Sequence, residues 1–206
     1  MVYNLIMPIL INGTGPLTGV TSINTSVSDT ELGYLDGVTS AIQTQINTAG
    51  GLVKITDNTF SAASAVNVNN CFSSTYTNYM ILIDLTTSAS AGTISLRLRA
   101  SGTDAATNYN YFGPYGGSSS GNINNSAQTE WFVAGSYNSA TVCAICDVFQ
   151  PNVAAQTRAG ISMFDSRNIV GLYGGIHTTS SAYDGFSLII GSGTITGTLR
   201  VYGYRN

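Results

Sequence analysis

The stretch TISLRLRA, residues 93–100, alternates apolar and polar side chains without interruption. In an extended strand its isoleucine and two leucines would point to one side, and its serine and two arginines to the other. This period of two is typical of a strand with one face buried against a core and one face in water. The stretch therefore predicts a sheet that covers a core on one side only.

The same kind of pattern extends outward from this strand. From Gly51 onwards, short apolar runs alternate with clusters of Gly, Ser, Asn and Asp at intervals of about ten residues, which is typical of a sandwich or barrel. Helical periodicity is absent there. The predicted strands are 52–55, 65–72, 79–86, 93–100, 130–134, 141–149, 159–164, 169–174, 185–190 and 197–204.

Three further segments refine this prediction. MILIDL, residues 80–85, has the denser apolar pattern of a strand covered on both faces. The last residues, 193–206, alternate again and indicate a C-terminal strand built into the sheet. Residues 101–125 form the longest predicted loop, and loops of this length are often functional.

Composition excludes several classes of function. Charged residues are 8% of the 206, against about 25% in an average soluble protein, and the net charge is -3 with Lys54 as the single lysine. A chain with so few cations offers no basic surface for nucleic acid or anionic lipid. The apolar residues 1–11 fall short of the roughly 20 needed to span a bilayer, so no membrane insertion is expected.

One segment, residues 26–47, is predicted to be helical instead. Ser28 and Glu31 have the spacing of a capping box, and Gly50 and Gly51 can close a helix that covers about 29–48. The apolar side chains of this helix recur every three or four residues: Leu32, Leu35, Val38, Ile42 and Ile46.

This apolar stripe is narrow, as in the seam of a coiled coil. Gly33 and Gly37 each lower helix stability by about 1 kcal/mol, so the helix needs a partner to persist. A lone helix lying on the β domain is the alternative. The pattern favours self-association.

The segment SDTELGYLDGVTSAIQTQIN, residues 28–47, resembles a segment that recurs in tail fibre and receptor-binding proteins of tailed bacteriophages. The resemblance implies a homotrimeric virion fibre made in the host cytoplasm. Its parts would be a docking segment (1–27) that binds other virion proteins, a coiled-coil stem (28–50) and a jelly-roll-like antiparallel β-sandwich head (51–206). Such a head would bind a glycan or protein on the host surface. The alternative is a capsid decoration or head fibre protein.

The cysteines and the single histidine suggest no chemistry. Cys71, Cys143 and Cys146 cannot all pair, and they are expected to be small buried hydrophobes. Cys143 and Cys146 form a CxxC motif, but residues three apart in a strand face opposite sides. His177 has no Cys or His at metal-ligand spacing and is expected on the surface or in a loop. We expect neither a metal nor a cofactor.

Four carboxylates, those of Asp104, Glu130, Asp165 and Asp184, could in principle supply the acid pair of a glycoside hydrolase. A glycan depolymerase is therefore a second alternative. Enzymes of that kind usually have a long β-helix, for which this chain is too short. The expectation is that the protein is not an enzyme.

Aromatic residues concentrate between the predicted strands. Aromatic rings stack on the apolar face of sugars, and Asn and Ser side chains bind sugar hydroxyls. The candidate receptor-binding residues are Tyr109, Tyr111, Tyr115, Trp131, Tyr173 and Tyr183. The competing interpretation is that these side chains seal trimer contacts or cap the ends of the sandwich.

Overall fold

The computed structural model describes residues 22–24, 27–28, 30, 33–34, 38, 51–88 and 92–205. The chain divides into two compact units, Met1–Ala49 and Gly50–Asn206. In the first unit, β1 (Ser22–Asn24) pairs antiparallel with β2 (Val27–Ser28). The predicted docking segment 1–27 lies largely outside the described residues.

The predicted helix over 29–48 is only partly covered by the described residues. Thr30 and Gly33 are helical, but Tyr34 lies in a turn and Val38 belongs to neither a helix nor a strand. An uninterrupted helix is therefore wrong at these two positions. Each of these two positions directly follows a glycine, Gly33 or Gly37, that lowers helix stability. The remaining predicted stem and cap residues lie outside the described part: Glu31, Leu32, Leu35, Ile42 and Ile46.

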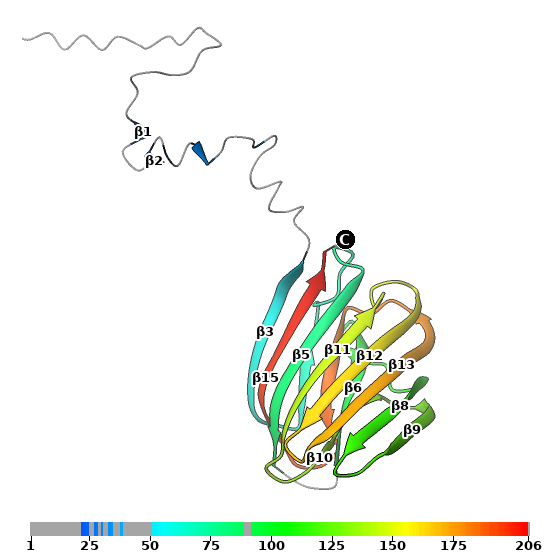
Figure 1. Ribbon diagram of the computed structural model, residues 1–206. Coiled ribbons are helices and arrows are strands. Elements are labelled where there is room, and N and C mark those ends of the chain that lie inside the picture. Colours follow the sequence, from blue (N-terminus) through cyan, green and yellow to red (C-terminus); the bar gives the residue numbers. More distant parts are fainter. Residues whose placement is uncertain are drawn as a thin grey trace, which may run out of the picture. The chain divides into compact units, whose positions relative to one another are not determined.

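The second unit is mainly β and its sheets are antiparallel, as predicted. The larger sheet has eight strands, shown side by side in Figure 1. In spatial order they are β3 (Leu52–Ala63), β15 (Ile195–Tyr204), β5 (Asn78–Thr87), β11 (Thr141–Phe149), β12 (Ala155–Asp165), β13 (Ile169–Ser181), β8 (Tyr109–Gly117) and β9 (Gly121–Gln128).

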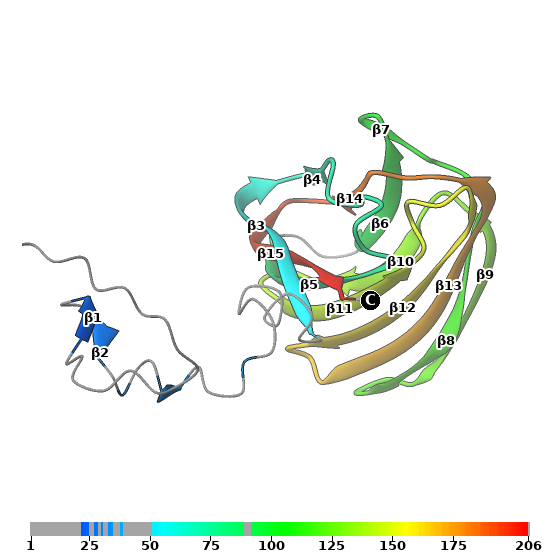
Figure 2. The ribbon, with the colours of Figure 1, turned by 90° about the horizontal axis from the view of Figure 1, so that it is seen from above.

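The smaller sheet is half as wide. Its order is β10 (Trp131–Ser136), β6 (Gly92–Ala100), β14 (Gly185–Ile190) and β4 (Ala65–Val68), and the short β7 (Thr103–Asp104) pairs with β6. The two sheets face each other and enclose one hydrophobic core (Figure 2). The larger sheet curves past β10, so the inner face of its last strands extends beyond the smaller sheet.

The predicted loop 101–125 is wrong, because it contains β7, all of β8 and the start of β9. Their Gly and Asn residues are typical of loops, so the sequence pattern did not indicate strands. In the structure, glycine allows neighbouring strands to pack closely. A Cβ on Gly113 would collide with the Leu172 carbonyl of the neighbouring strand β13. The residues of β8 have a low intrinsic preference for strands. The strand forms because it pairs extensively with both β13 and β9.

The predicted exposure of two strands also needs correction. On β6, Ile94, Leu96 and Leu98 are buried as expected, but Arg99 on the other face is only 8% exposed. The turn between β6 and β7 brings Asp104 back to pair with Arg99 at 2.5 Å, which covers that face. The segment 80–85 shows the opposite error, since alternate residues of β5 are buried on one face only. No helix among the described residues is long and apolar enough to cross a membrane.

Candidate binding cleft

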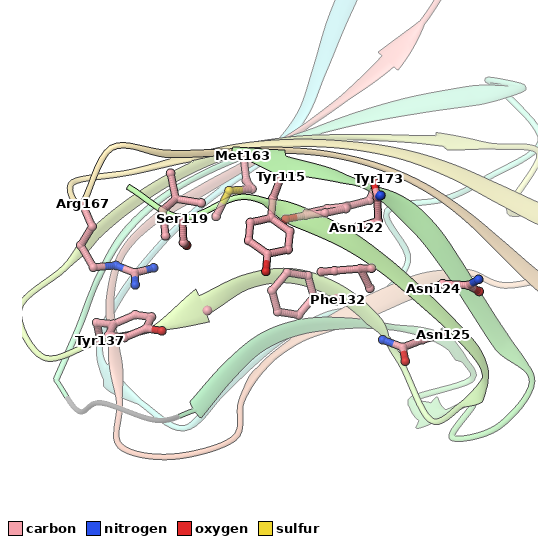
Figure 3. A pocket seen from close by; sticks show the side chains of 13 residues that line it. Tyr115, Ser119, Asn122, Asn124, Asn125, Phe132, Tyr137, Met163, Arg167 and Tyr173 are labelled. Atoms are coloured by element: carbon pink, nitrogen blue, oxygen red, sulfur yellow. The ribbon is translucent and has the colours of Figure 1, made fainter. Parts of the chain in front are cut away.

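A cleft of about 630 Å³ lies where the larger sheet extends beyond β10 (Figure 3). Strands β8 and β9 form one side, β10 and the residues after it form another, and β12, β13 and their connecting turn complete it. The lining residues are Tyr115, Ser119, Asn122, Ile123, Asn124, Asn125, Phe132, Gly135, Tyr137, Met163, Arg167, Ile169 and Tyr173. We call this the binding cleft.

Phe132 is the central aromatic side chain of the cleft. Its ring centroid is 5.4 Å from that of Tyr173 in an edge-to-face contact and 6.2 Å from that of Tyr111 in a stacked one. Phe132 itself is half-buried. One side of the Phe132 ring therefore packs against core residues, and part of the ring remains accessible in the cleft.

Glycines allow two tyrosine rings to lie against the strands. A Cβ on Gly171 would collide with the Tyr173 ring, and a Cβ on Gly121 would lie 2.9 Å from the Tyr115 hydroxyl. Any other residue at these two positions would force the rings to move. Burial raises the pKa of Tyr173 to about 12, so this hydroxyl stays neutral at physiological pH.

Amide and hydroxyl groups surround these rings. Asn122, Asn124 and Ser119 are exposed at the rim, and Asn125 donates to the Tyr111 hydroxyl at 3.1 Å. An amide offers both donors and an acceptor, which suits a ligand that carries several hydroxyls. The rim can therefore form hydrogen bonds in either direction.

Arg167 is the one charged residue that lines the cleft. Its guanidinium carbon lies 3.2 Å from the centroid of the Tyr137 ring, a cation–π contact, and it pairs with the buried Asp165 carboxylate. The Asp165 carboxylate also accepts from the backbone N–H of Arg167 at 2.9 Å, and this hydrogen bond stabilises the turn between β12 and β13. The charge of Arg167 is thus balanced within the protein, and the cleft is close to neutral.

The six predicted receptor-binding residues divide into two groups. Tyr115 and Tyr173 line the cleft, and Tyr111 lies directly behind it against Phe132. The other three do not line the cleft and are buried: Tyr109 (0% exposed), Trp131 (0%) and Tyr183 (4%). Their side chains belong to the core, where Tyr109 packs edge-on against Trp131 at 5.2 Å. Tyr173 is equally buried, at 4%, so it contributes only the edge of its ring to the cleft.

His177 is buried as well, which corrects the prediction of a surface histidine. Its Nε2 lies 3.0 Å from the Thr107 carbonyl oxygen, and a carbonyl can only accept, so Nε2 carries the proton. Nδ1 then accepts from the Tyr183 hydroxyl at 3.2 Å. Burial lowers the pKa of His177, which keeps the imidazole neutral.

The other candidate reactive groups are already engaged. Cys71 and Cys146 are buried as predicted, but Cys143 is exposed, so the expectation of burial is wrong for it. Cys143 and Cys146 lie on opposite faces of β11, and burial raises the pKa of Cys146 to about 12. Among the four candidate carboxylates, three are in ion pairs with arginines and that of Asp184 accepts from the Ser101 backbone N–H at 2.8 Å. No aspartate or glutamate lines the binding cleft.

Sequence reasoning missed the cleft residues Phe132, Asn122, Asn124, Asn125 and Arg167. Phe132 lies in an apolar run in which alternation does not separate core from surface. The asparagines occur in GNINNSAQ, residues 121–128, where their density indicates turns more strongly than a strand. The one usable signal was this concentration of amides beside Tyr111 and Tyr115.

Comparisons with known proteins give no guide to this site. No protein-family model matches the chain, and searches of the curated proteins and of the solved structures find no match. Within the described part of the chain, no three His, Cys, Asp or Glu side chains are grouped so as to hold a metal ion. The chemistry of the cleft is therefore argued from its own residues.

Proposed function

We propose that the protein is a homotrimeric structural fibre of a tailed phage virion whose head binds a glycan of the host surface in the binding cleft. The observation that carries this proposal is the combination of accessible aromatic rings with surrounding amides in a near-neutral cleft of about 630 Å³. Sugar rings stack on aromatic faces, and their hydroxyls need the donors and acceptors that the asparagines offer.

The sheet topology is compatible with a jelly-roll head. Eight strands divide equally between the sheets, with β3, β15, β5 and β11 in one and β4, β14, β6 and β10 in the other. This arrangement suits a jelly roll, which combines two Greek keys. The hairpins β8–β9 and β12–β13 are additions that widen one sheet, and it is these additions that form the cleft.

The helical stem completes the proposed fibre. Residues 28–50 would become helical when three chains associate, because the narrow apolar stripe then has partners. Replacing Leu35 and Ile42 by Asp would place charges in this seam, each of which is costly when buried. Sedimentation of the double variant should then show loss of the trimer. A variant that stays trimeric would contradict a stem that assembles the protein.

Glycan binding is tested with the full chain against polysaccharides from the host surface, by calorimetry and by competition with phage adsorption. Phe132→Ala should weaken binding about tenfold, equivalent to about 1.4 kcal/mol. Phe112→Ala is the matched control, since Phe112 is an exposed aromatic residue of β8 that does not line the cleft. Equal losses in the two variants would contradict the cleft.

Two further measurements separate the alternatives. Antibody labelling of whole particles would show the protein on the tail or on the capsid, and a capsid label would favour a decoration or head fibre protein. Release of reducing ends from the bound polysaccharide would indicate a depolymerase. The proposed adhesin gives a tail label and releases none.

A further inference from the structure

The outer face of the eight-stranded sheet carries an apolar band that nothing in the described chain covers. Large side chains project from its central strands with high exposed fractions: Phe164 (53%), Leu172 (58%), Ile145 (41%) and Val170 (41%). With half-buried Leu82 we call these five residues the outer band. Contiguous exposed apolar surface of this kind usually marks an interaction site.

The strand register makes the outer band continuous. Ile145 is paired with Leu82 on one side and with Ser162 on the other, and Ser162 is paired with Leu172. Phe164 lies two pairs further along, and therefore on the same face, opposite Val170. Five side chains from four adjacent strands, β5, β11, β12 and β13, therefore form one surface.

Hollows accompany these projecting side chains. One of about 320 Å³ lies where Gly160, Ser162 and Gly174 leave the sheet low beside Ile145 and Leu172. Asp147 also lines it, and its carboxylate accepts from the Tyr204 hydroxyl. A Cβ on Gly160 or Gly174 would meet nothing within 4 Å, so the fold of the single chain does not require glycine there. The outer band thus offers both projections and a recess to a partner.

Opposite charges lie beyond the two ends of the outer band, Asp84 beside Leu82 and Arg158 past the recess, and they identify the partner. Asp84 on β5 and Arg158 on β12 are exposed, and neither takes part in an ion pair among the described residues. By contrast, a carboxylate pairs with each of Lys54, Arg97, Arg99, Arg167 and Arg200. An apolar surface with an acid beyond one end and a base beyond the other is complementary to another copy of itself.

We propose that the outer band packs against a second copy of this chain, with Asp84 of one copy facing Arg158 of the next. The contact lies on the head and is separate from both the stem and the binding cleft. It would bury the exposed apolar side chains and place the two unpaired charges together. Association by this face therefore needs no helical segment.

Cross-linking tests the proposed pairing directly in the full chain. Within one chain, Asp84 and Arg158 are two strands and about six residues apart, which is roughly 20 Å and too far for a disulfide. In a Cys143→Ser background, Asp84→Cys with Arg158→Cys should give a disulfide-linked dimer under mild oxidation. Cross-linking no greater than that of either single cysteine variant would overturn the proposal.

Filling the recess tests the surface independently. Gly160→Val should leave the fold intact, because its side chain points into open space, but should block the contact. In the Leu35→Asp/Ile42→Asp background, sedimentation should show self-association weakened at least tenfold, with glycan affinity unchanged. Ser180→Val, at an exposed position of β13 outside the outer band, is the control. Undiminished association of Gly160→Val, or a parent that is monomeric at every concentration, would overturn the proposal.

Discussion

Trp131 and Phe132 are neighbours on β10, and as consecutive strand residues they project from opposite faces of it. Trp131 is fully buried in the part of the interior that the smaller sheet covers, whereas Phe132 lines the part that extends beyond it. Both regions contain mainly aromatic and aliphatic side chains. The difference therefore comes from the direction in which each side chain points and from the extension of the larger sheet past β10, the edge strand of the smaller sheet.

This comparison shows how a binding surface can arise from an ordinary sheet. The hairpin strands β8, β9, β12 and β13 continue the ladder without adding strands to the opposite sheet. Their inward side chains are of the type that would normally be buried. They remain partly exposed because no strand of the smaller sheet lies opposite them. Affinity for an apolar or amphipathic ligand is the expected consequence.

The largest expected effect comes from the covered region. Trp131→Ala should lower the free energy of unfolding by about 3–5 kcal/mol, because it removes the largest buried side chain and leaves a cavity against Tyr109. Phe112→Ala, on the exposed side of β8, should cost less than about 1 kcal/mol. Urea unfolding followed by circular dichroism measures both. Similar midpoints for the two variants would mean that the covered and exposed regions do not differ as described.

A somewhat smaller effect is expected on the outer face of the smaller sheet. Arg99 donates to Asn69 Oδ1 at 2.9 Å and to Ser187 Oγ at 2.7 Å, besides pairing with Asp104. Arg99→Met should cost about 2–4 kcal/mol, since it leaves the partly buried Asp104 carboxylate without its cation.

Arg158→Met is the control for this prediction, because Arg158 is exposed and forms no ion pair within the described part of the chain. Its cost should stay within about 0.5 kcal/mol at concentrations where the chain is monomeric. The same unfolding experiment compares the two. A cost for Arg99→Met as small as that of the control would show that the network around Arg99 adds no stability.

Sequence patterns predicted the covered region much better than the open one. Strands 141–149 and 185–190 were placed with their observed bounds because their apolar side chains alternate against a core. The cleft strands β8 and β9 could not be placed this way, since Gly113 and Gly121 meet a constraint from a neighbouring strand and a tyrosine ring. Arg99 was assigned to solvent because its cover, Asp104, returns through a turn that alternation does not reveal. Contacts between residues far apart in the sequence determine the structure at Arg99 and at these glycines. The local alternation of apolar and polar residues carries no information about such contacts.

The strand β13 passes through both regions, with Tyr173 in the cleft and His177 in the core, and this gives the last prediction. Burial lowers the pKa of His177 below its ordinary value of 6.5, so the unfolded chain takes up this proton first as the pH falls. The unfolded state then binds more protons than the native state, and the free energy of unfolding decreases with falling pH below about 6.5. The slope from one such group is at most about 1.4 kcal/mol per pH unit. His177→Gln keeps a donor for the Thr107 carbonyl and removes the titration, so its stability should change less between pH 7 and pH 5. Urea midpoints across this range measure the difference, and parallel profiles for the two proteins would show that His177 is not held neutral in the covered region.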